Sequence, residues 1–330
     1  MKKGKLLYIT IALVLAFIYV MLNPFFIKHE INGPVEIHIS RGMNFTDVTA
    51  LLWRHQIIRH PRLFVFWGKI RGLQYKIKHG TYRFEGRLSD HEVLQKLVSG
   101  DVELVKVTIP EGFNLWQIAD RLDALEITDK NQFLKASRDR DLLNKLHIDA
   151  PSVEGYLFPD TYFFPKYTEA ETVITRMVEN MRSQLSSDML NRAKELGLTE
   201  RGLLTLASLI EKEAKVDDER PLISAVFHNR LRRGMPLESD PTAVYGVEPP
   251  PKVITRRDLR RDSPYNTYRI KGLPPGPIAS PGLKSIMAAL YPADVPYLYF
   301  VATKDGRHKF SKTEREHQRA VRKYRSNHNK

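Results

Sequence analysis

An uncharged segment near the N-terminus most constrains the fold of this chain, because it is long enough to cross a bilayer. Residues 6–22 carry no charge, and residues 25–27 add two phenylalanines and an isoleucine. A helix of this length covers about 25 Å, close to the hydrocarbon thickness of a membrane. Lys2, Lys3 and Lys5 precede it, and such charges stay cytoplasmic. We therefore expect residues 1–5 in the cytoplasm and a single-pass anchor over residues 6–27.

Cleavage of this segment as a signal peptide is the alternative. No small-x-small motif follows the apolar run, so an uncleaved anchor is favoured. The rest of the chain is then expected outside the cytoplasm. There, a net charge of +14 points to anionic lipid headgroups or acidic wall polymers rather than to nucleic acid. The chain has no cysteine, which excludes disulfides, thiolate metal sites and a cysteine nucleophile. We predict no metal site and no cofactor.

A weak internal repeat follows the anchor. Residues 37–52 and 107–122 each read as a strand, a glycine-containing turn and an amphipathic helix begun by an asparagine, Asn44 or Asn114. Between them, residues 80–84 resemble a strand, and Ser89 to Glu92 has the spacing of a capping box. The pattern over residues 35–125 resembles the LysM-type glycan-binding module. A purely structural repeat is the alternative reading.

The remainder reads as a polar helical connector over 126–150 and a mixed α/β domain over 151–330, so the fold class is α+β. Residues 169–196 are expected to form one long charged helix. The following helix is almost wholly apolar from Leu203 and ends at Glu211. A carboxylate at the rim of an apolar helix holds its proton more tightly than in water, as a general acid requires.

Glu213 lies beside Glu211 in sequence, and periodicity alone does not choose between them. The helical neighbours of Glu211 include small residues, Ala207 and Ser208, which leave room for a sugar and favour it slightly. Glu213 is interpreted as a solvated acid near Lys212. The sequence therefore predicts Glu211 as the catalytic acid.

Three polar residues downstream of Glu211 are candidates for substrate binding. Asn229 could bind an acetamido group or orient Glu211, although a polar surface role is as plausible. Ser239 and Asp240 precede Pro241 as at a helix start, so Asp240 is interpreted first as a cap and second as a rival catalytic carboxylate. The corner is expected to shape the cleft.

Aromatic and amide groups at 265–268 form a further candidate. Tyr265, Asn266 and Tyr268 combine flat apolar faces with hydrogen-bonding groups, which suits pyranose rings and their acetamido substituents. A strand explains the pattern almost as well.

Six ordered blocks from residue 154 onward resemble the MltG (YceG-like) endolytic murein transglycosylases. The blocks are EGYLFPDTY at 154–162, LASLIEKEA at 206–214, ERPLISAVFHNRL at 219–231, GMPLESDPTAVYG at 234–246, SPYNTYRIKGLPPGPIASPG at 263–282 and PYLYFVATKDGRHKFSKT at 296–313. The resemblance covers essentially the whole chain, and it assigns the catalytic glutamate to Glu211. Glu238 departs from the family pattern, which usually carries glutamine there.

The resemblance implies a lyase that cleaves MurNAc–GlcNAc bonds in nascent peptidoglycan strands and leaves 1,6-anhydroMurNAc ends, thereby limiting strand elongation. It also implies a single-pass inner-membrane protein with its catalytic domain in the periplasm, near membrane-bound peptidoglycan synthases. Two other functions are open. A glycan-binding scaffold would not need Glu211, and a hydrolase would use Glu211 together with Asp240.

Overall fold

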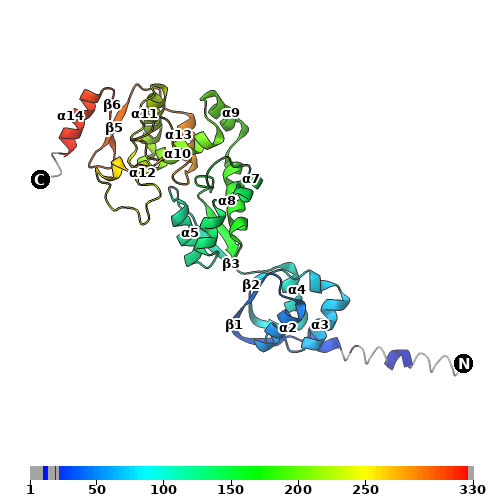
Figure 1. Cartoon of the computed structure of the whole chain (residues 1–330). Helices are drawn as coiled ribbons and strands as arrows, with labels where there is room; N and C mark the ends of the chain where they lie inside the picture. Colours follow the sequence, from blue (N-terminus) through cyan, green and yellow to red (C-terminus); the bar gives the residue numbers. More distant parts are fainter. Residues whose placement is uncertain (1–9, 14–18, 20–21, 326–330) are drawn as a thin grey trace. The chain divides into compact units, whose positions relative to one another are not determined.

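The computed structural model describes residues 10–13, 19 and 22–325, and the chain divides into two compact units (Figure 1). Unit 1 comprises Met1–Val105 and Phe163–Thr168, and unit 2 comprises Lys106–Tyr162 and Glu169–Lys330. The expected anchor over residues 6–27 lies largely outside the described residues. In the described part, no helix is long and apolar enough to cross a membrane. Helices and short strands are both present, in agreement with the predicted α+β class.

Unit 1 is built around one antiparallel strand pair and three helices. Its elements are η1 (Asn23–Phe26), β1 (His29–Ile39), α2 (Phe45–Arg54), α3 (Pro61–Ile70), η2 (Leu73–Tyr75), β2 (Gly80–Leu88) and α4 (Asp90–Ser99). β1 and β2 pair from His29 opposite Leu88 to Ile39 opposite Gly80, with a shift in register between Ile31 and Val35. The predicted caps are confirmed, since Asn44 begins α2 and Ser89 with Glu92 forms a capping box on α4.

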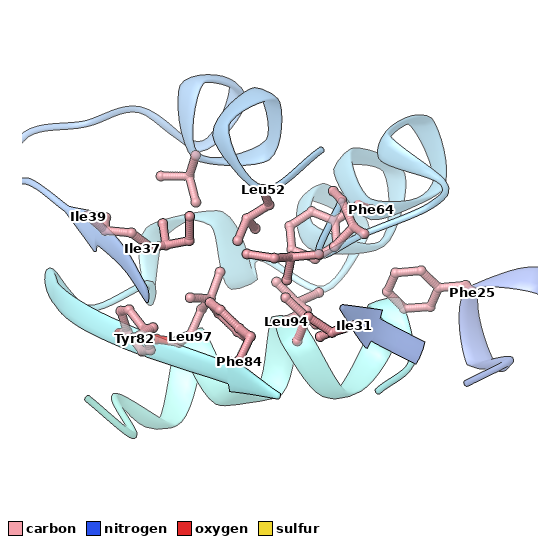
Figure 2. Packing of buried hydrophobic residues seen from close by; sticks show 14 residues of the cluster. Phe25, Ile31, Ile37, Ile39, Leu52, Phe64, Tyr82, Phe84, Leu94 and Leu97 are labelled. Atoms are coloured by element: carbon pink, nitrogen blue, oxygen red, sulfur yellow. Dashed lines mark hydrogen bonds between the residues drawn. The ribbon is translucent and has the colours of Figure 1, made fainter. Parts of the chain in front are cut away.

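The core of unit 1 lies between the strand pair and the helices (Figure 2). Alternate residues of β1 and β2, such as Ile37 and Phe84, point inward, as the period of a strand with one buried face requires. Leu52 of α2, Phe64 of α3 and Leu94 of α4 meet them and are fully or almost fully buried.

Unit 2 carries the remaining elements. They are α5 (Leu115–Ala124), α6 (Lys130–Ala136), α7 (Arg140–Lys145), α8 (Ala170–Gln184), α9 (Ser187–Glu195), α10 (Glu200–Glu213), η3 (Asp217–Glu219), α11 (Arg220–Arg232), α12 (Asp240–Val244), η4 (Asp258–Arg260), α13 (Leu283–Leu290), β5 (Tyr299–Ala302), β6 (His308–Ser311) and α14 (Glu314–Arg325). β3 (Leu104–Thr108), which begins in unit 1, pairs with β4 (Thr161–Pro165), which ends in unit 1, and β5 and β6 form an antiparallel hairpin. α10 packs against α11 and α13.

The structure differs from the sequence predictions at two boundaries. The two copies of the internal repeat belong to different units, because the chain divides after Val105 and the second copy, with α5, packs against α6 of unit 2. The single long helix expected over residues 169–196 is also wrong. It breaks into α8 and α9, because the Ser186 side chain accepts a hydrogen bond from the Met189 amide and so begins a new helix.

Candidate active site

α10 brings the candidate acids to the end of a buried helix. The Thr199 side chain accepts a hydrogen bond from the Gly202 amide and so caps the start of the helix. Every residue from Leu203 to Ile210 is buried, so the helix is fixed on several sides before it ends at Glu213. The side chains of its last turn consequently have defined positions.

Glu211 forms a charge pair with Arg220 of α11. Its Oε1 atom lies 3.2 Å from Arg220 Nη1, and its Oε2 accepts a hydrogen bond of 3.0 Å from the Gly282 backbone amide. The side chains of Glu211 and Arg220 are only 7% and 9% exposed. Arg220 also binds Asp217 and the hydroxyl of Ser285. Both oxygens of Glu211 therefore face hydrogen-bond donors.

A second carboxylate, Glu111, lies beside this pair. Its side chain lies so close to Gly282 that a β-carbon at that glycine would come within 1.9 Å of Glu111 Oε1. Burial, and then repulsion from Glu211, raises the pKa of Glu111. The sequence analysis treated residues 107–122 only as part of a repeat and so missed this acid.

Glu213 has different surroundings from Glu211. Ser239 Oγ donates a hydrogen bond of 2.6 Å to Glu213 Oε1. Removal from water raises the pKa of Glu213 to about 7; the Ser239 hydrogen bond acts in the opposite direction, and the charge of Asp240 adds to the increase. Glu213 is only partly exposed and so less solvated than the sequence suggested, because the 237–240 corner packs over the end of α10, with Leu237 2% and Ser239 1% exposed.

Asp240 and Tyr268 extend this corner toward solvent. Tyr268 OH donates a 2.5 Å hydrogen bond to Asp240 Oδ1, and Asp240 is exposed. Ser239 holds the N-cap position of α12, but its hydroxyl points to Glu213 and makes no capping bond. The predicted capping role of Asp240 is therefore wrong. Its carboxylate is instead available on the surface beside Glu213.

Hydrogen bonds to the hydroxyls of two threonines hold the corner in place. The Ser239 amide donates to Thr267 Oγ1 at 3.0 Å, and the hydroxyls of Thr267 and Thr242 are 2.8 Å apart. All three residues are at most 1% exposed. This buried network fixes the position of the Ser239 hydroxyl relative to Glu213.

Glu238 adds little unbalanced charge to the corner. Its carboxylate lies 2.7 Å from Nη1 of Arg230, whose side chain is 6% exposed. Arg230 also donates to the carbonyls of Pro236 and Leu298. The acid at position 238 is thus compensated by a buried guanidinium.

Two predicted substrate-binding amides are structural. Asn229 Nδ2 donates to the carbonyls of Val295 and Tyr297, and its Oδ1 accepts from Arg232. Asn266 is fully buried. Its Nδ2 donates to the carbonyls of residues 259 and 261, and its Oδ1 accepts from the amide of residue 268. These bonds occupy both amides, so we do not assign them to a glycan.

Tyr265 belongs to an aromatic cluster around a carboxylate that the sequence analysis missed. Its ring centroid is 4.6 Å from that of Tyr245, whose hydroxyl donates a 2.9 Å hydrogen bond to Glu154 Oε2. The Leu115 amide donates to the same oxygen at 3.1 Å, whereas the buried Oε1 has no partner among the described residues. Desolvation raises the pKa of Glu154, which is 1% exposed, to about 7. Glu154 is the first residue of the EGYLFPDTY block, but the sequence does not show that it is buried.

Gly155 is required beside Glu154. It has φ of +77°, and a β-carbon there would lie 2.2 Å from Pro277 Cβ. We expect Gly155→Ala to destabilise the protein by about 2 to 4 kcal/mol, through left-handed strain and overlap with a rigid ring. Urea unfolding measures this change. Gly197→Ala is the matched control, since that glycine has φ of +74° but no atom near its would-be β-carbon. Equal losses in both variants would refute the packing part of the argument.

Known proteins are similar to this chain over most of its length. The model of the YceG-like family matches residues 37–323. A protein of Bacillus subtilis named endolytic murein transglycosylase is 33% identical over 95% of this chain and 91% of its own length. A Streptococcus pneumoniae protein of the same name is 31% identical over 87% of this chain and 58% of its own.

A solved structure agrees with the family match. The crystal structure of a yceG-like protein from Listeria monocytogenes superposes with a TM-score of 0.61 at 34% identity. It covers 87% of this chain and 99% of that one. The chain therefore belongs to the YceG-like family.

Proposed function

We propose that this protein is an endolytic peptidoglycan lytic transglycosylase that cleaves MurNAc–GlcNAc bonds within glycan strands and leaves 1,6-anhydroMurNAc ends. Family membership and the names of its relatives support this reaction. The observation that carries it in the chain itself is the carboxyl of Glu213. It lies at a solvent-reachable corner beside exposed Asp240, and its pKa is raised to about 7.

Glu213 fits the acid and base steps better than Glu211, which the sequence favoured. A general acid must carry a proton before the reaction, and a carboxyl with a pKa near 7 does so in about half of the molecules at neutral pH. Glu211 is instead paired with a guanidinium and a backbone amide. We therefore assign the proton transfer to Glu213 and the support of the adjacent loop to Glu211.

One carboxyl is sufficient for the proposed reaction. Glu213 donates its proton to the glycosidic oxygen as the bond to the muramic C1 breaks. The C6 hydroxyl of the same sugar attacks C1, and the Glu213 carboxylate then takes the hydroxyl proton. No water is consumed, and the enzyme returns to its starting protonation state. Positioned proton transfer of this kind accelerates a reaction by about 10²- to 10⁴-fold.

Hydrolysis is the second candidate, because a second carboxylate is present. Asp240 is close enough for its charge to raise the pKa of Glu213. In an inverting or retaining hydrolase, such a partner would activate water or attack the sugar. The two reactions leave different chain ends, so their products distinguish them.

The test of the proposed function is digestion of purified peptidoglycan by the full chain, followed by mass spectrometry. Soluble fragments from the interior of strands, each one water lighter than a hydrolytic product, are the expected result. Fragments with reducing ends would instead favour the hydrolase. Binding to peptidoglycan without cleavage would favour a scaffold.

Ser239→Ala is expected to move the pH profile of the reaction. The hydrogen bond from Ser239 lowers the pKa of Glu213, so its loss should shift the alkaline limb of kcat/KM to higher pH. The loss of one hydrogen bond should also reduce the maximal rate by about fivefold. Ser224→Ala is the control, since its buried hydroxyl has no partner in the described part of the chain. An unshifted limb in Ser239→Ala would argue against Glu213 as the acid.

We further propose the location and the role of unit 1. The uncharged run over residues 6–22, preceded by three lysines, supports a single-pass inner-membrane anchor with a cytoplasmic N-terminus and a periplasmic catalytic domain. The order β1-α2-α3-β2 with an antiparallel strand pair supports a LysM-like glycan-binding role for unit 1. Such a protein would work on nascent strands next to membrane-bound synthases.

A further inference from the structure

An apolar surface of unit 1 lies where the chain follows the uncharged run. η1 begins at Asn23, directly after residue 22. Phe25 is fully buried, and its ring stacks on Trp67 of α3 with centroids 5.7 Å apart; Figure 2 shows its side chain at the edge of the core. The ring of Phe26 meets the same indole at 5.6 Å and remains 45% exposed. These contacts hold η1 against α3.

α3 exposes two large apolar side chains in addition to the residues that face the core. Phe64 and Gly68 are buried, whereas Phe66 is 47% and Ile70 is 66% exposed. A surface helix normally carries polar residues on its solvent side. Phe66 contacts Trp67 through its ring, and Ile70 lies one turn further along α3. We call Phe26, Phe66, Trp67 and Ile70 the apolar patch.

A cavity of about 340 Å³ opens beside the apolar patch. Phe25, Phe26, Leu73 and Leu94 give it apolar walls, and Arg71 and Lys76 add two cations. The Arg71 guanidinium lies 5.7 Å from the centre of the Trp67 ring. The cavity thus offers apolar surface and positive charge together.

The acids nearest the apolar patch come from α4 and are paired, Glu92 with Lys28 at 2.6 Å and Asp90 with the backbone amides before α3. From Val48 to Phe84 the sequence contains no aspartate or glutamate, and its exposed cations include Arg62 and Lys69 of α3 itself. Indole rings and basic side chains are the residues that proteins place at the boundary between lipid headgroups and acyl chains. A soluble acidic partner would match the cations but not the apolar patch.

We propose that the apolar patch lies on the membrane surface and that the adjacent cavity holds an anionic phospholipid. The phosphate would pair with Arg71 and Lys76, and the acyl chain would lie along Phe26 and Trp67. The inference rests on the membrane anchor of the proposed function. It adds a second attachment, which orients unit 1 on the bilayer.

Site-directed spin labelling tests this proposal cleanly, because the chain has no cysteine. The full chain carrying Ile70→Cys is labelled and reconstituted into vesicles of phosphatidylcholine and phosphatidylglycerol. The ratio of oxygen to water-soluble nickel accessibility should be several-fold higher than for Leu104→Cys, a 52% exposed apolar control in β3 of the same unit. Equal, water-like ratios in protein that floats with the vesicles would overturn the docking while leaving the anchor intact. Protein that does not float would overturn both.

The role of the headgroup is tested in the same Ile70→Cys background. In vesicles of pure phosphatidylcholine, the ratio of oxygen to nickel accessibility at the label should be several-fold lower than in the mixed vesicles. The double substitution Arg71→Gln with Lys76→Gln should abolish this difference between the two lipid compositions. Equal accessibility ratios in both lipid compositions before these substitutions would overturn the anionic phospholipid site.

Discussion

Replacing Glu213 with glutamine is expected to lower the formation of 1,6-anhydro ends by about 10²- to 10⁴-fold, because the amide can neither donate nor recover the catalytic proton. The side chain keeps its size, so the contact with Ser239 and the fold should survive. In the wild-type enzyme, kcat/KM should fall about tenfold per pH unit above pH 7, as Glu213 loses its proton. Quantification of anhydro ends by mass spectrometry across pH measures both effects.

Glu211→Gln is the matched control, two residues away on the same helix. It removes one charge from the pair with Arg220, which is left with Asp217 and Ser285. We therefore expect a lower melting temperature but substantial activity when the assay is run well below that temperature. The reverse pattern, with activity lost in folded Glu211→Gln and kept in Glu213→Gln, would return the catalytic role to the residue that the sequence favoured.

Glu154 should make the protein less stable as the pH rises. Its pKa is about 7 when folded and near 4.5 when unfolded, so between these values the folded state binds more protons. The free energy of unfolding should therefore fall with increasing pH across this window, by up to about 1.4 kcal/mol per unit from this group. The stabilisation from the protonated Glu154 carboxyl is fully present below pH 4.5 and is lost as the pH rises through about 7.

Glu154→Gln isolates this effect, because glutamine does not titrate and can still accept from Tyr245 and Leu115. Between pH 4.5 and pH 7 the wild type should lose about 3 kcal/mol of unfolding free energy that the variant keeps. Urea titrations at several pH values measure this difference. A difference that stays constant across the window would mean that Glu154 is already ionised when folded.

Local signals in the sequence predicted local structure well. The N-caps at Asn44, Ser89 and Asn114 are confirmed, because a capping side chain acts on an amide only two or three residues away. The repeat suggested one region over residues 35–125, whereas its two copies lie in different units, since similar segments can pack into different cores.

The candidate site depended on contacts that sequence spacing does not contain. Helical periodicity alone did not choose between Glu211 and Glu213, whose roles depend on what folds against each. Arg220 and the Gly282 amide reach Glu211, whereas the corner at Ser239 reaches Glu213. Glu154 was hidden for a similar reason, because its partner Tyr245 lies far along the chain. The motifs located the site, and tertiary packing divided the roles among its acids.

The most direct test of the proposed reaction is digestion of peptidoglycan in water enriched in heavy oxygen. In an intramolecular transfer the new bond at C1 comes from the sugar's own C6 hydroxyl, so the released ends should carry no label. Hydrolysis would place one heavy oxygen at each new reducing end. Anhydro ends without label, absent from the Glu213→Gln digest, are the result that our account predicts. Labelled reducing ends would contradict it and assign the chemistry to Glu213 and Asp240 acting as a hydrolytic pair.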